Sequence, residues 1–323
     1  MKVLVTGAGG FAGGHLVECL LGGEVIATPE AVWGCDLATT PPPYLPPTVR
    51  WLAADLRQPE AARQVIETVR PDRIYHLAAQ AFAGDSWANP WPLLETNLRS
   101  QVNLCEAVLA AHVEPRILVV GSGEAYGRVT AADLPINENC PLRPYNPYGV
   151  SKVAQDLLGY QYHLSRGLAV VRVRPFNHLG PRQSRLFVAP AFAAQIAAIE
   201  QGRQPPIIRV GNLEARRDFT DVRDMVRAYV LALERCTPGE AYNIGAGRSY
   251  GIRQLLEMLL SLSSVAITVE TDPQRLRPAE VPETVCDASK FRACTGWTPQ
   301  IPFERSVRDV LEYERAQLEH NAP

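Results

Sequence analysis

A tyrosine and a lysine stand four residues apart in the run Tyr148-Gly149-Val150-Ser151-Lys152. On a helix, side chains at this spacing lie on one face, with Cβ atoms about 5–6 Å apart. An ammonium near a phenol favours the phenolate, so we expect Lys152 to lower the Tyr148 pKa from about 10 toward neutral pH. The pair could then act as a general acid or base on a hydroxyl or carbonyl group. Any long helix offers such pairs by chance, so this chemistry depends on the elements around them.

The first residues of the chain predict a dinucleotide site. Lys2–Thr6 is a short apolar run with β-branched residues, typical of a buried parallel strand. A glycine-rich turn follows, and then apolar residues recur at helical spacing from Gly14 to Leu21. This order lets backbone N–H groups approach a pyrophosphate, although a plain glycine-rich turn is the alternative. The predicted cofactor-binding residues of the turn are Gly7, Gly10, Phe11, Ala12 and Gly13.

An acid at the end of the second strand bears on which nicotinamide cofactor is used. We expect that strand at Ala31–Cys35, ending at Asp36, which lies 23 residues after Gly13. A carboxylate near this distance binds the adenosine ribose, so Asp36 favours NAD(H) and repels the 2′-phosphate of NADP(H). Glu24–Ala27 is a rival second strand, and Asp36 could be an ordinary turn residue. We therefore predict NAD(H) or NADP(H), with NAD(H) favoured.

Composition indicates a globular protein and argues against several partners. The 323 residues are 46% apolar and 20% charged, and the net charge of −2 gives no electrostatic case for nucleic-acid or membrane binding. No apolar run approaches the roughly 20 residues that span a bilayer. The first strand already begins at Lys2, so we expect no signal peptide. Seven cysteines without a C-x-x-C pair predict reduced thiols in a cytoplasmic protein, and no residue spacing predicts a metal site.

Alternating strands and helices predict an α/β fold with a doubly wound parallel (Rossmann) sheet. We expect strands at 2–6, 31–35, 49–53, 73–78, 116–121 and 168–174, and helices at 61–69, 92–111 and 147–166. Residues 1–175 with about 218–246 would form the dinucleotide domain, and about 176–217 with 247–323 a smaller, loop-rich C-terminal α/β substrate lobe. Ligands bind where parallel strands end. This edge would carry further cofactor contacts at Asp55, Leu56, Leu77, Ala78, Ala79 and Gln80, and the loop Ser122-Gly123-Glu124.

The assembled pattern resembles the extended short-chain dehydrogenase/reductase family, in the group that modifies nucleotide sugars. The resemblance covers nearly the whole chain, and several independent motifs occur in the family's order. These motifs are Thr6-Gly7 through Gly13, Asp55-Leu56, His76-Leu77-Ala78-Ala79-Gln80, Ser122, Tyr148-x-x-x-Lys152, Arg174-Pro175-Phe176-Asn177-His178, Arg217-Asp218-Phe219 and Tyr242-Asn243-Ile244. The resemblance implies an NAD(P)-dependent oxidoreductase.

The family's chemistry implies a ketone reduction at C4 of a sugar. Tyr148 would give its proton to the forming alkoxide, and Ser122 would orient the keto oxygen. Lys152 would also hold the nicotinamide ribose of the cofactor, which carries the hydride. Segments such as Ser122–Gly127 and Pro175–Pro181 are similar to family members that act on GDP-sugars. This similarity implies GDP-4-keto-6-deoxy-D-mannose as substrate, reduced to GDP-D-rhamnose or GDP-6-deoxy-D-talose.

Glu124 bears on which reaction of the family is performed. The family's dehydratases need a base for the C5 proton and an acid for the departing C6 hydroxyl, and they carry a second side chain beside the glutamate. Here that neighbour is Gly123, so we favour a reductase over a GDP-mannose 4,6-dehydratase or a C4-epimerase. Glu124 remains a candidate catalytic base, with the alternative that it is a strand-end acid that binds the backbone. The intact Ser122, Tyr148 and Lys152 argue against a sensor that binds the cofactor without catalysis.

The remaining site residues follow from the resemblance alone. Asn177 would bind the diphosphate or the sugar, and Arg217 would pair with phosphate, which suits a guanidinium fork. Arg277 and Glu280 would hold the nucleotide phosphate and ribose, and Ser86 is a possible sugar contact. Each of the charged residues could instead be a solvated surface group. His178 is more typical of a structural histidine than of a catalyst.

The family commonly dimerises through a four-helix bundle formed by the helices on either side of the Ser122 strand. We therefore predict a homodimer, with the alternative that the apolar residues concerned simply face the sheet. The candidate interface residues are Leu93, Leu94, Leu98, Leu104, Val108, Val153, Leu157 and Leu158.

Overall fold

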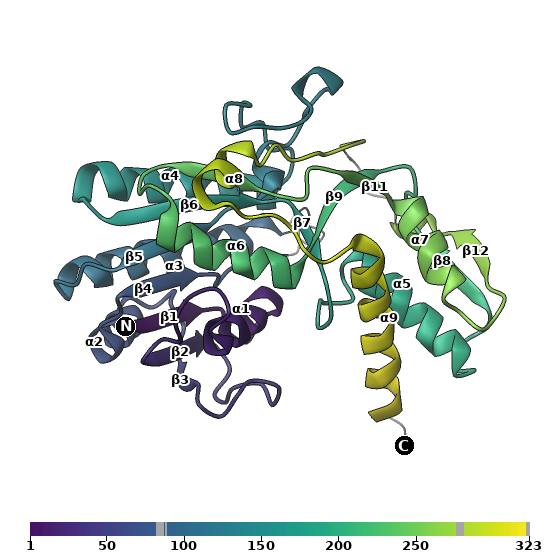
Figure 1. The fold of residues 1–323 in the computed structure, drawn as a ribbon, viewed down its shortest axis with the longest axis horizontal. Helices are drawn as coiled ribbons and strands as arrows, with labels where there is room; N and C mark the ends of the chain where they lie inside the picture. The colour runs from purple at the N-terminus through teal and green to yellow at the C-terminus, as the bar shows by residue number, and fades with distance from the viewer. Residues whose placement is uncertain (82–86, 88, 276–280, 321–323) are drawn as a thin grey trace.

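The computed structural model describes residues 1–81, 87, 89–275 and 281–320. Within these residues, seven parallel strands form one sheet in the order β10-β6-β5-β4-β1-β2-β3 (Figure 1). The strand order reverses between β1 and β4, so the crevice where such sheets bind ligands lies at their carboxyl ends. The strands are β1 (Lys2–Thr6), β2 (Ala31–Asp36), β3 (Arg50–Ala53), β4 (Arg73–His76), β5 (Arg116–Val120), β6 (Ala169–Pro175) and β10 (Ala241–Ile244).

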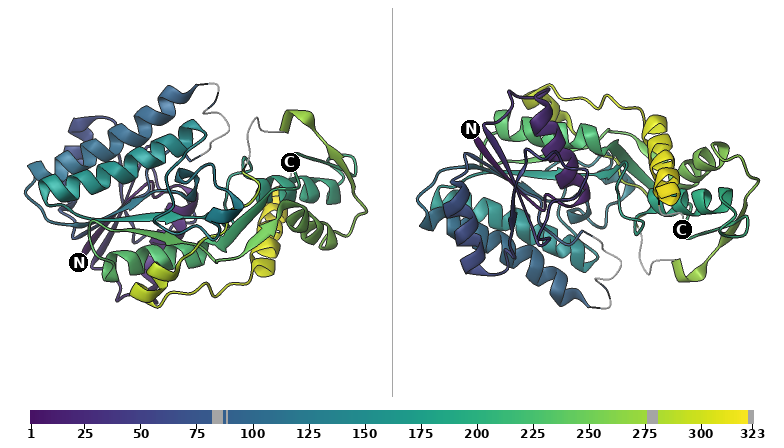
Figure 2. Two further views of the ribbon diagram at one scale, coloured as in Figure 1. Left: turned by 90° about the horizontal axis from the view of Figure 1, so that it is seen from above. Right: turned by 90° about the horizontal axis from the view of Figure 1, so that it is seen from below.

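Helices cover both faces of this sheet (Figure 2). In β1, Val3 and Val5 pack into one hydrophobic core and Leu4 into the other, because successive side chains of a strand point to opposite faces. Burial on both faces explains why the strand is apolar throughout. Helices α1 (Phe11–Gly22) and α6 (Val222–Arg235) cover the first face; α2 (Pro59–Val69), α3 (Pro90–Ala110) and α4 (Pro147–Arg166) cover the second.

Helix α4 has clear start and stop signals in the sequence. The Asn146 side chain accepts the Gly149 N–H at 2.6 Å and caps the first turn, while Pro147 occupies a position where no helical N–H is needed. Gly167, with φ of +72°, ends the helix in the left-handed conformation that glycine tolerates. The predicted bounds 147–166 are therefore confirmed.

The second half of the chain is more regular than the sequence suggested. We expected 176–217 and 247–323 to be loop-rich, and this was wrong, because three helices there bury their apolar faces in a separate core. These helices are α5 (Val188–Glu200), α7 (Ile252–Ser261) and α9 (Phe303–His320). The short strands β7 (Asn177–Leu179), β9 (Arg216–Asp221) and β11 (Ser249–Gly251) form a three-stranded sheet, and β8 (Ile207–Val210) pairs with β12 (Thr268–Thr271).

One late helix returns to the main sheet. Helix α8 (Ser289–Thr295) packs against α6 and β10, and Phe291 and Trp297 belong to the core on that face of the sheet. The helix and strand expected within 218–246 are α6 and β10, and β10 pairs with β6. The division of the chain into a dinucleotide domain and a nucleotide-sugar lobe stays a prediction.

Strand pairing decides between two candidate strands, and burial bears on the candidate interface residues. The second strand is Ala31–Asp36, and the rival Glu24–Ala27 forms no strand. Among the candidate interface residues, Leu93, Leu104 and Val108 are buried within the subunit, so they face the protein interior rather than a partner. In the part of the chain that the structure describes, no helix has the length and apolar character needed to cross a membrane.

Candidate active site

The turn between β1 and α1 packs closely against backbone and ends at an uncapped helix start. Gly7 has φ of +69°, and a Cβ there would lie 2.8 Å from the Ala78 nitrogen. A Cβ on Gly13 would overlap the Gly7 carbonyl oxygen. Gly10 precedes α1, and no side chain caps this helix end. Uncapped N–H groups at a helix start favour an anion, so the turn fits the pyrophosphate of a dinucleotide.

Phe11 and Ala12 begin α1, and Phe11 links the turn to the strand that follows β6. Its ring stacks on the His178 ring with centroids 5.8 Å apart. His178 Nδ1 lies 3.2 Å from the Phe176 carbonyl oxygen, and burial lowers the pKa of His178. His178 therefore packs as a neutral ring, in keeping with the structural role expected for it.

The two predicted cofactor acids have different surroundings. Asp36 accepts the Gly9 N–H on Oδ2 at 2.9 Å and the N–H of the next residue on Oδ1 at 2.7 Å, so it holds the glycine turn. Asp55 is paired with Arg57, whose Nη2 lies 2.7 Å from Oδ2, and this partner lowers the Asp55 pKa. Leu56, which lies between Asp55 and Arg57 in the sequence, is buried. Asp36 is thus the acid that lies directly against the dinucleotide turn.

The segment after β4 is fixed from two sides. Thr6 Oγ1 accepts the Ala78 N–H at 3.2 Å, and the Asn97 side chain both accepts the Gln80 N–H at 2.8 Å and donates to the Gln80 carbonyl at 3.2 Å. Asn97 also donates to Ser151 Oγ at 2.9 Å. The buried amide of Asn97 on α3 therefore connects this sheet edge to α4. The sequence places Asn97 within a helix, and a polar amide among buried residues is the signal that it has a partner. The sequence analysis did not predict that it joins Gln80 to Ser151.

Ser122, Tyr148 and Lys152 meet at the carboxyl edge of the sheet. Ser122 follows β5; its Oγ accepts the Glu124 N–H at 3.1 Å and is hydrogen-bonded to the Tyr148 phenol. Lys152 Nζ lies 5.9 Å from the Tyr148 ring centroid and donates to the Val120 carbonyl at 2.9 Å. The structure thus brings a phenol, a hydroxyl and an ammonium to one place, as the spacing suggested.

Burial controls the titration of this group. It raises the pKa of Tyr148 to about 12; the hydrogen bond to Ser122 opposes the rise and the Glu124 charge adds to it. The expectation that the Tyr148 pKa would be lowered toward neutral pH was wrong, because loss of hydration is the largest cause of the shift and raises it. Burial also lowers the pKa of Lys152 to about 8 and that of His76 to about 3. At neutral pH, Tyr148 therefore keeps its proton, which suits a general acid.

Positions 123 and 124 are constrained in different ways. A Cβ on Gly123 would lie 3.2 Å from carbons of the Phe176 ring, so a larger residue would have to displace that ring. Glu124 Oε2 accepts hydrogen bonds from Tyr145 Oη at 3.3 Å and Asn146 Nδ2 at 3.1 Å. Asn146 thus caps α4 and holds Glu124 at once, a second role that the sequence analysis missed.

The residues predicted to bind the nucleotide sugar are only partly brought together. Asn177 is exposed at the start of β7. Arg217 on β9 donates from Nη1 to the carbonyls of Arg216 and Val281, both at 2.8 Å, so part of its guanidinium binds backbone. The predicted residues Ser86, Arg277 and Glu280 lie outside the described residues.

Asp218, next along β9, joins two segments at the site. Its fully buried carboxylate accepts the N–H groups of residues 246–247 and of Cys286, each at 2.9 Å. Backbone hydrogen bonds also join the stretch 281–287 to Ile136 on its other side. The sequence analysis named Asp218 only as part of the motif Arg217-Asp218-Phe219 and did not predict its hydrogen bonds. A carboxylate within a strand is the feature that could have indicated them.

A buried network of charged side chains joins α4 to the neighbouring strand β6. Asp156 accepts hydrogen bonds from Arg172 Nη1 at 2.7 Å and from Arg174 Nη2 at 2.9 Å. Arg174 Nη1 donates to Tyr126 Oη at 3.0 Å, and Tyr126 donates to Asn243 Oδ1 at 2.6 Å. All five side chains are buried. The network therefore connects the helix that carries Tyr148 and Lys152 to β6, β10 and the loop after Ser122.

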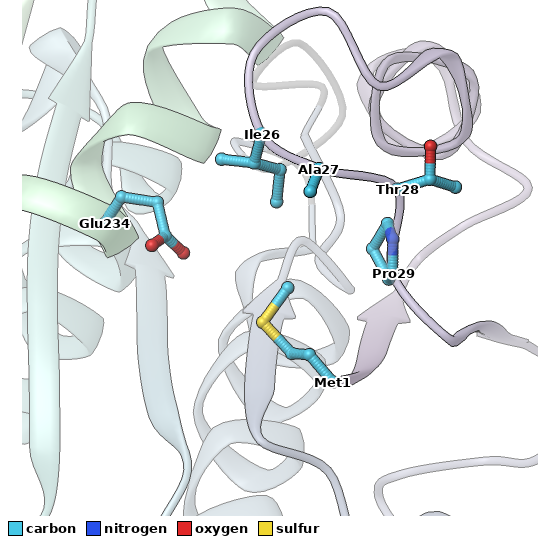
Figure 3. Close-up of a pocket in the computed structure, with 6 residues that line it drawn as sticks. All are labelled: Met1, Ile26, Ala27, Thr28, Pro29 and Glu234. Atoms are coloured by element: carbon cyan, nitrogen blue, oxygen red, sulfur yellow. The ribbon is translucent and has the colours of Figure 1, made fainter.

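A separate pocket lies away from these groups. It is at the opposite edge of the sheet, because Met1 directly precedes the amino end of β1 (Figure 3). Its lining residues are Met1, Ile26, Ala27, Thr28, Pro29 and Glu234. In the described ranges, no three His, Cys, Asp or Glu side chains are grouped to hold a metal ion.

Comparison with known proteins agrees with this arrangement. The family described as GDP-mannose 4,6 dehydratase matches residues 4–310. The chain belongs to this family. Its members within the extended short-chain dehydrogenase/reductases are NAD(P)-dependent enzymes that act on nucleotide sugars, so this chain is an oxidoreductase of that family.

Individual relatives match over nearly their whole length. A Pseudomonas aeruginosa protein named GDP-6-deoxy-D-mannose reductase is 34% identical over 310 residues, covering 96% of each chain. The structure of RMD from Pseudomonas aeruginosa complexed with NADPH superposes with a TM-score of 0.83 at 31% identity, covering 98% of this chain and 100% of that one. The Thermus thermophilus UDP-glucose 4-epimerase complexed with NAD gives 0.85 at 30% identity, covering 98% and 99%.

Proposed function

We propose that this enzyme reduces the C4 ketone of GDP-4-keto-6-deoxy-D-mannose, giving GDP-D-rhamnose or GDP-6-deoxy-D-talose. The observation that carries the proposal is the packing of Gly123 against Phe176 beside Glu124. A 4,6-dehydratase must remove the C5 proton and also protonate the departing C6 hydroxyl, and position 123 supplies no side chain for the second task. The similarity to a protein named GDP-6-deoxy-D-mannose reductase supports the same direction.

The chain's own groups suit the reductive direction. A bound reduced nicotinamide supplies the hydride. Tyr148, protonated at neutral pH, donates its proton to the oxygen that becomes negative at C4, and Ser122 donates a hydrogen bond to the same oxygen. Lys152, whose Nζ lies 5.9 Å from the Tyr148 ring centroid, would hold the nicotinamide ribose. The glycine turn and the uncapped start of α1 would hold the pyrophosphate, with Asp36 at the adenosine ribose.

Asp36 supports NAD(H) as the preferred cofactor. A carboxylate at this position repels a 2′-phosphate, and two backbone N–H groups hold it in place. The Pseudomonas aeruginosa RMD structure is complexed with NADPH, so the preference of this enzyme between NADH and NADPH should be measured directly. We expect a higher kcat/KM with NADH than with NADPH. Asp36→Asn keeps the shape of the side chain but removes its charge, so it should reduce the ratio of kcat/KM for NADH to kcat/KM for NADPH. An NADPH preference in the unchanged protein would contradict the assignment.

The deciding assay uses two substrates in parallel. GDP-4-keto-6-deoxy-D-mannose, generated in place by a separate dehydratase, should oxidise NADH, whereas GDP-mannose should not. NMR of the product would then identify rhamnose or talose. A 4-keto product formed from GDP-mannose without added reductant would show that Glu124 suffices for dehydration and would replace this proposal with a GDP-mannose 4,6-dehydratase.

We also propose a homodimer through α3 and α4. Along α4, Val150, Leu157 and Leu164 recur every seven residues and are 46%, 51% and 65% exposed. Such a stripe suits an intermolecular helix pair. Leu157→Glu should convert a dimer to a monomer in sedimentation, whereas Leu186→Glu, at a similarly exposed site outside the stripe, should not. A monomeric unchanged protein would rule the dimer out.

A further inference from the structure

Two cysteines far apart in the sequence lie together behind the sheet. Cys236 directly follows α6 and is 2% exposed, and Cys294, in α8, is half-buried against the same hydrophobic core. Helix α8 lies beside α6 (Figure 1). Cys236 precedes the amino end of β10, so the pair lies at the opposite edge of the sheet from Ser122 and Tyr148. Nothing in the proposed reaction uses these thiols.

Direct contacts fix the two thiols near each other. Cys294 Sγ donates to the Arg235 carbonyl oxygen at 3.2 Å, which belongs to the peptide group that leads into Cys236. The two thiol groups also interact with each other. Arg235 Nη1 donates to the Thr295 carbonyl at 2.5 Å, and Arg116 Nη2 donates to the Cys236 carbonyl at 2.6 Å. The backbones on both sides of the pair are therefore held by hydrogen bonds while the two thiol groups are in contact.

We propose that Cys236 and Cys294 form a redox-sensitive dithiol that a low-molecular-weight disulfide converts to an intramolecular disulfide joining α6 to α8. The more exposed Cys294 attacks the oxidant as a thiolate and releases one thiol, forming a mixed disulfide. Cys236 then loses its proton and attacks Cys294 Sγ, releasing the second thiol. The protein loses two thiol protons and two electrons, and the oxidant is reduced to two thiols.

The cross-link would act on stability rather than on the reaction. It would close a loop between residues 58 positions apart, which removes conformations from the unfolded chain. Burial raises the pKa of Cys236, so the second step should be slow at neutral pH and faster in mild alkali. Lys290, also on α8, donates to Glu240 and to the Ala241 carbonyl, so α8 already has fixed anchors next to the pair.

The test is oxidation of the folded protein with oxidised glutathione. We expect two fewer free thiols than the seven of the reduced protein, a peptide map linking 236 to 294, and a higher midpoint of thermal unfolding that dithiothreitol reverses. Cys294→Ala and Cys236→Ala should each abolish the link and the shift. Cys140→Ser, at another half-buried cysteine, should leave both intact.

Three outcomes would overturn the proposal: seven thiols remaining after oxidation, glutathione staying attached to Cys294 while Cys236 is free, or a link between other cysteines. The readouts are thiol counts, mass and unfolding temperature. None depends on substrate turnover, so this proposal and the reductase activity can fail separately.

Discussion

The two sides of the candidate site are built by different means. On the catalytic side, side chains on regular elements hold one another: Asp156 on α4 binds two arginines of β6, and Asn146 caps the same helix. On the opposite side, Arg217 and Asp218 of β9 hold mainly the backbone of connecting segments. Buried charge pairs thus anchor the helix that carries Tyr148 and Lys152, whereas hydrogen bonds to backbone hold the connecting segments around β9.

The largest effect on activity is expected on the catalytic side, at Tyr148. Tyr148→Phe removes the acidic proton but keeps the ring, so we expect activity to fall about 10²–10⁴-fold with cofactor affinity nearly unchanged. Turnover and NADH titration measure the two effects. Tyr160→Phe, at an exposed tyrosine of the same helix, is the control and should retain activity. Full turnover by Tyr148→Phe would refute the assigned acid.

The buried network should dominate stability on the catalytic side. Asp156→Asn leaves Arg172 and Arg174 without their counter-charge, and breaking a buried pair in this way costs about 3–5 kcal/mol of unfolding free energy. Denaturant unfolding measures the loss. On the other side, Glu214→Gln breaks the exposed pair with Arg253 and should leave the midpoint unchanged. Equal losses of unfolding free energy in Asp156→Asn and Glu214→Gln would show that the buried network contributes no more to stability than the exposed pair.

Asp218 tests the backbone-held side. Asp218→Asn leaves fewer acceptors for three N–H groups, of which that of Cys286 is buried, so we expect about 1–3 kcal/mol of destabilisation. If the loops it holds place the substrate, KM for the nucleotide sugar should rise while kcat stays within a fewfold. Steady-state kinetics distinguish this from damage to the acid, which would lower kcat instead.

The pH dependence should report Lys152 rather than Tyr148. The Lys152 pKa of about 8 lies below its free value, whereas the Tyr148 pKa of about 12 lies above the working range. We expect kcat/KM for the reduced cofactor to fall about tenfold per pH unit above pH 8, as Lys152 loses its charge. Lys152→Arg keeps the charge and should remove that fall. A profile flat to pH 10 would show that the charge of Lys152 does not matter.

The same lysine makes a prediction for stability. Its pKa is lower in the folded than in the unfolded protein, so the unfolded chain binds more protons between about pH 8 and its free value of about 10.4. Stability attributable to Lys152 should therefore rise with pH across this window. Comparing unfolding free energies of the protein and Lys152→Met at pH 7 and 9.5 isolates this contribution.

The smallest expected effect is at the start of α4. Asn146→Ala removes the cap and a hydrogen bond to Glu124, costing about 1 kcal/mol of unfolding free energy. Asn146→Ser can still cap the helix but cannot reach Glu124, so comparing the two variants separates the two roles. A change in activity in both variants, with stability lost only in the alanine variant, would show that the contact with Glu124 matters for the reaction.

The sequence predicted elements with strong local signals and missed what depends on tertiary surroundings. Ala31–Asp36 and Pro147–Arg166 were found because an apolar run and clear caps mark them. The Tyr148 pKa was predicted in the wrong direction, since burial is set by distant segments. Helix α5 was missed because Pro190 and a nearly uniform apolar run hide its period. The partners of Asn97 and Asp218 lie on other elements, and residue spacing alone does not reveal them.

The anchoring of residues 281–287 has a consequence for re-engineering this fold. Asp218 and Ile136 form hydrogen bonds to this stretch from two sides, so its backbone is fixed relative to β9 and to the segment around Ile136. A chimaera joined within 281–287 would therefore keep these hydrogen bonds without redesign of the main sheet. We expect such chimaeras to fold, because their junction lies in a stretch that hydrogen bonds already hold on two sides.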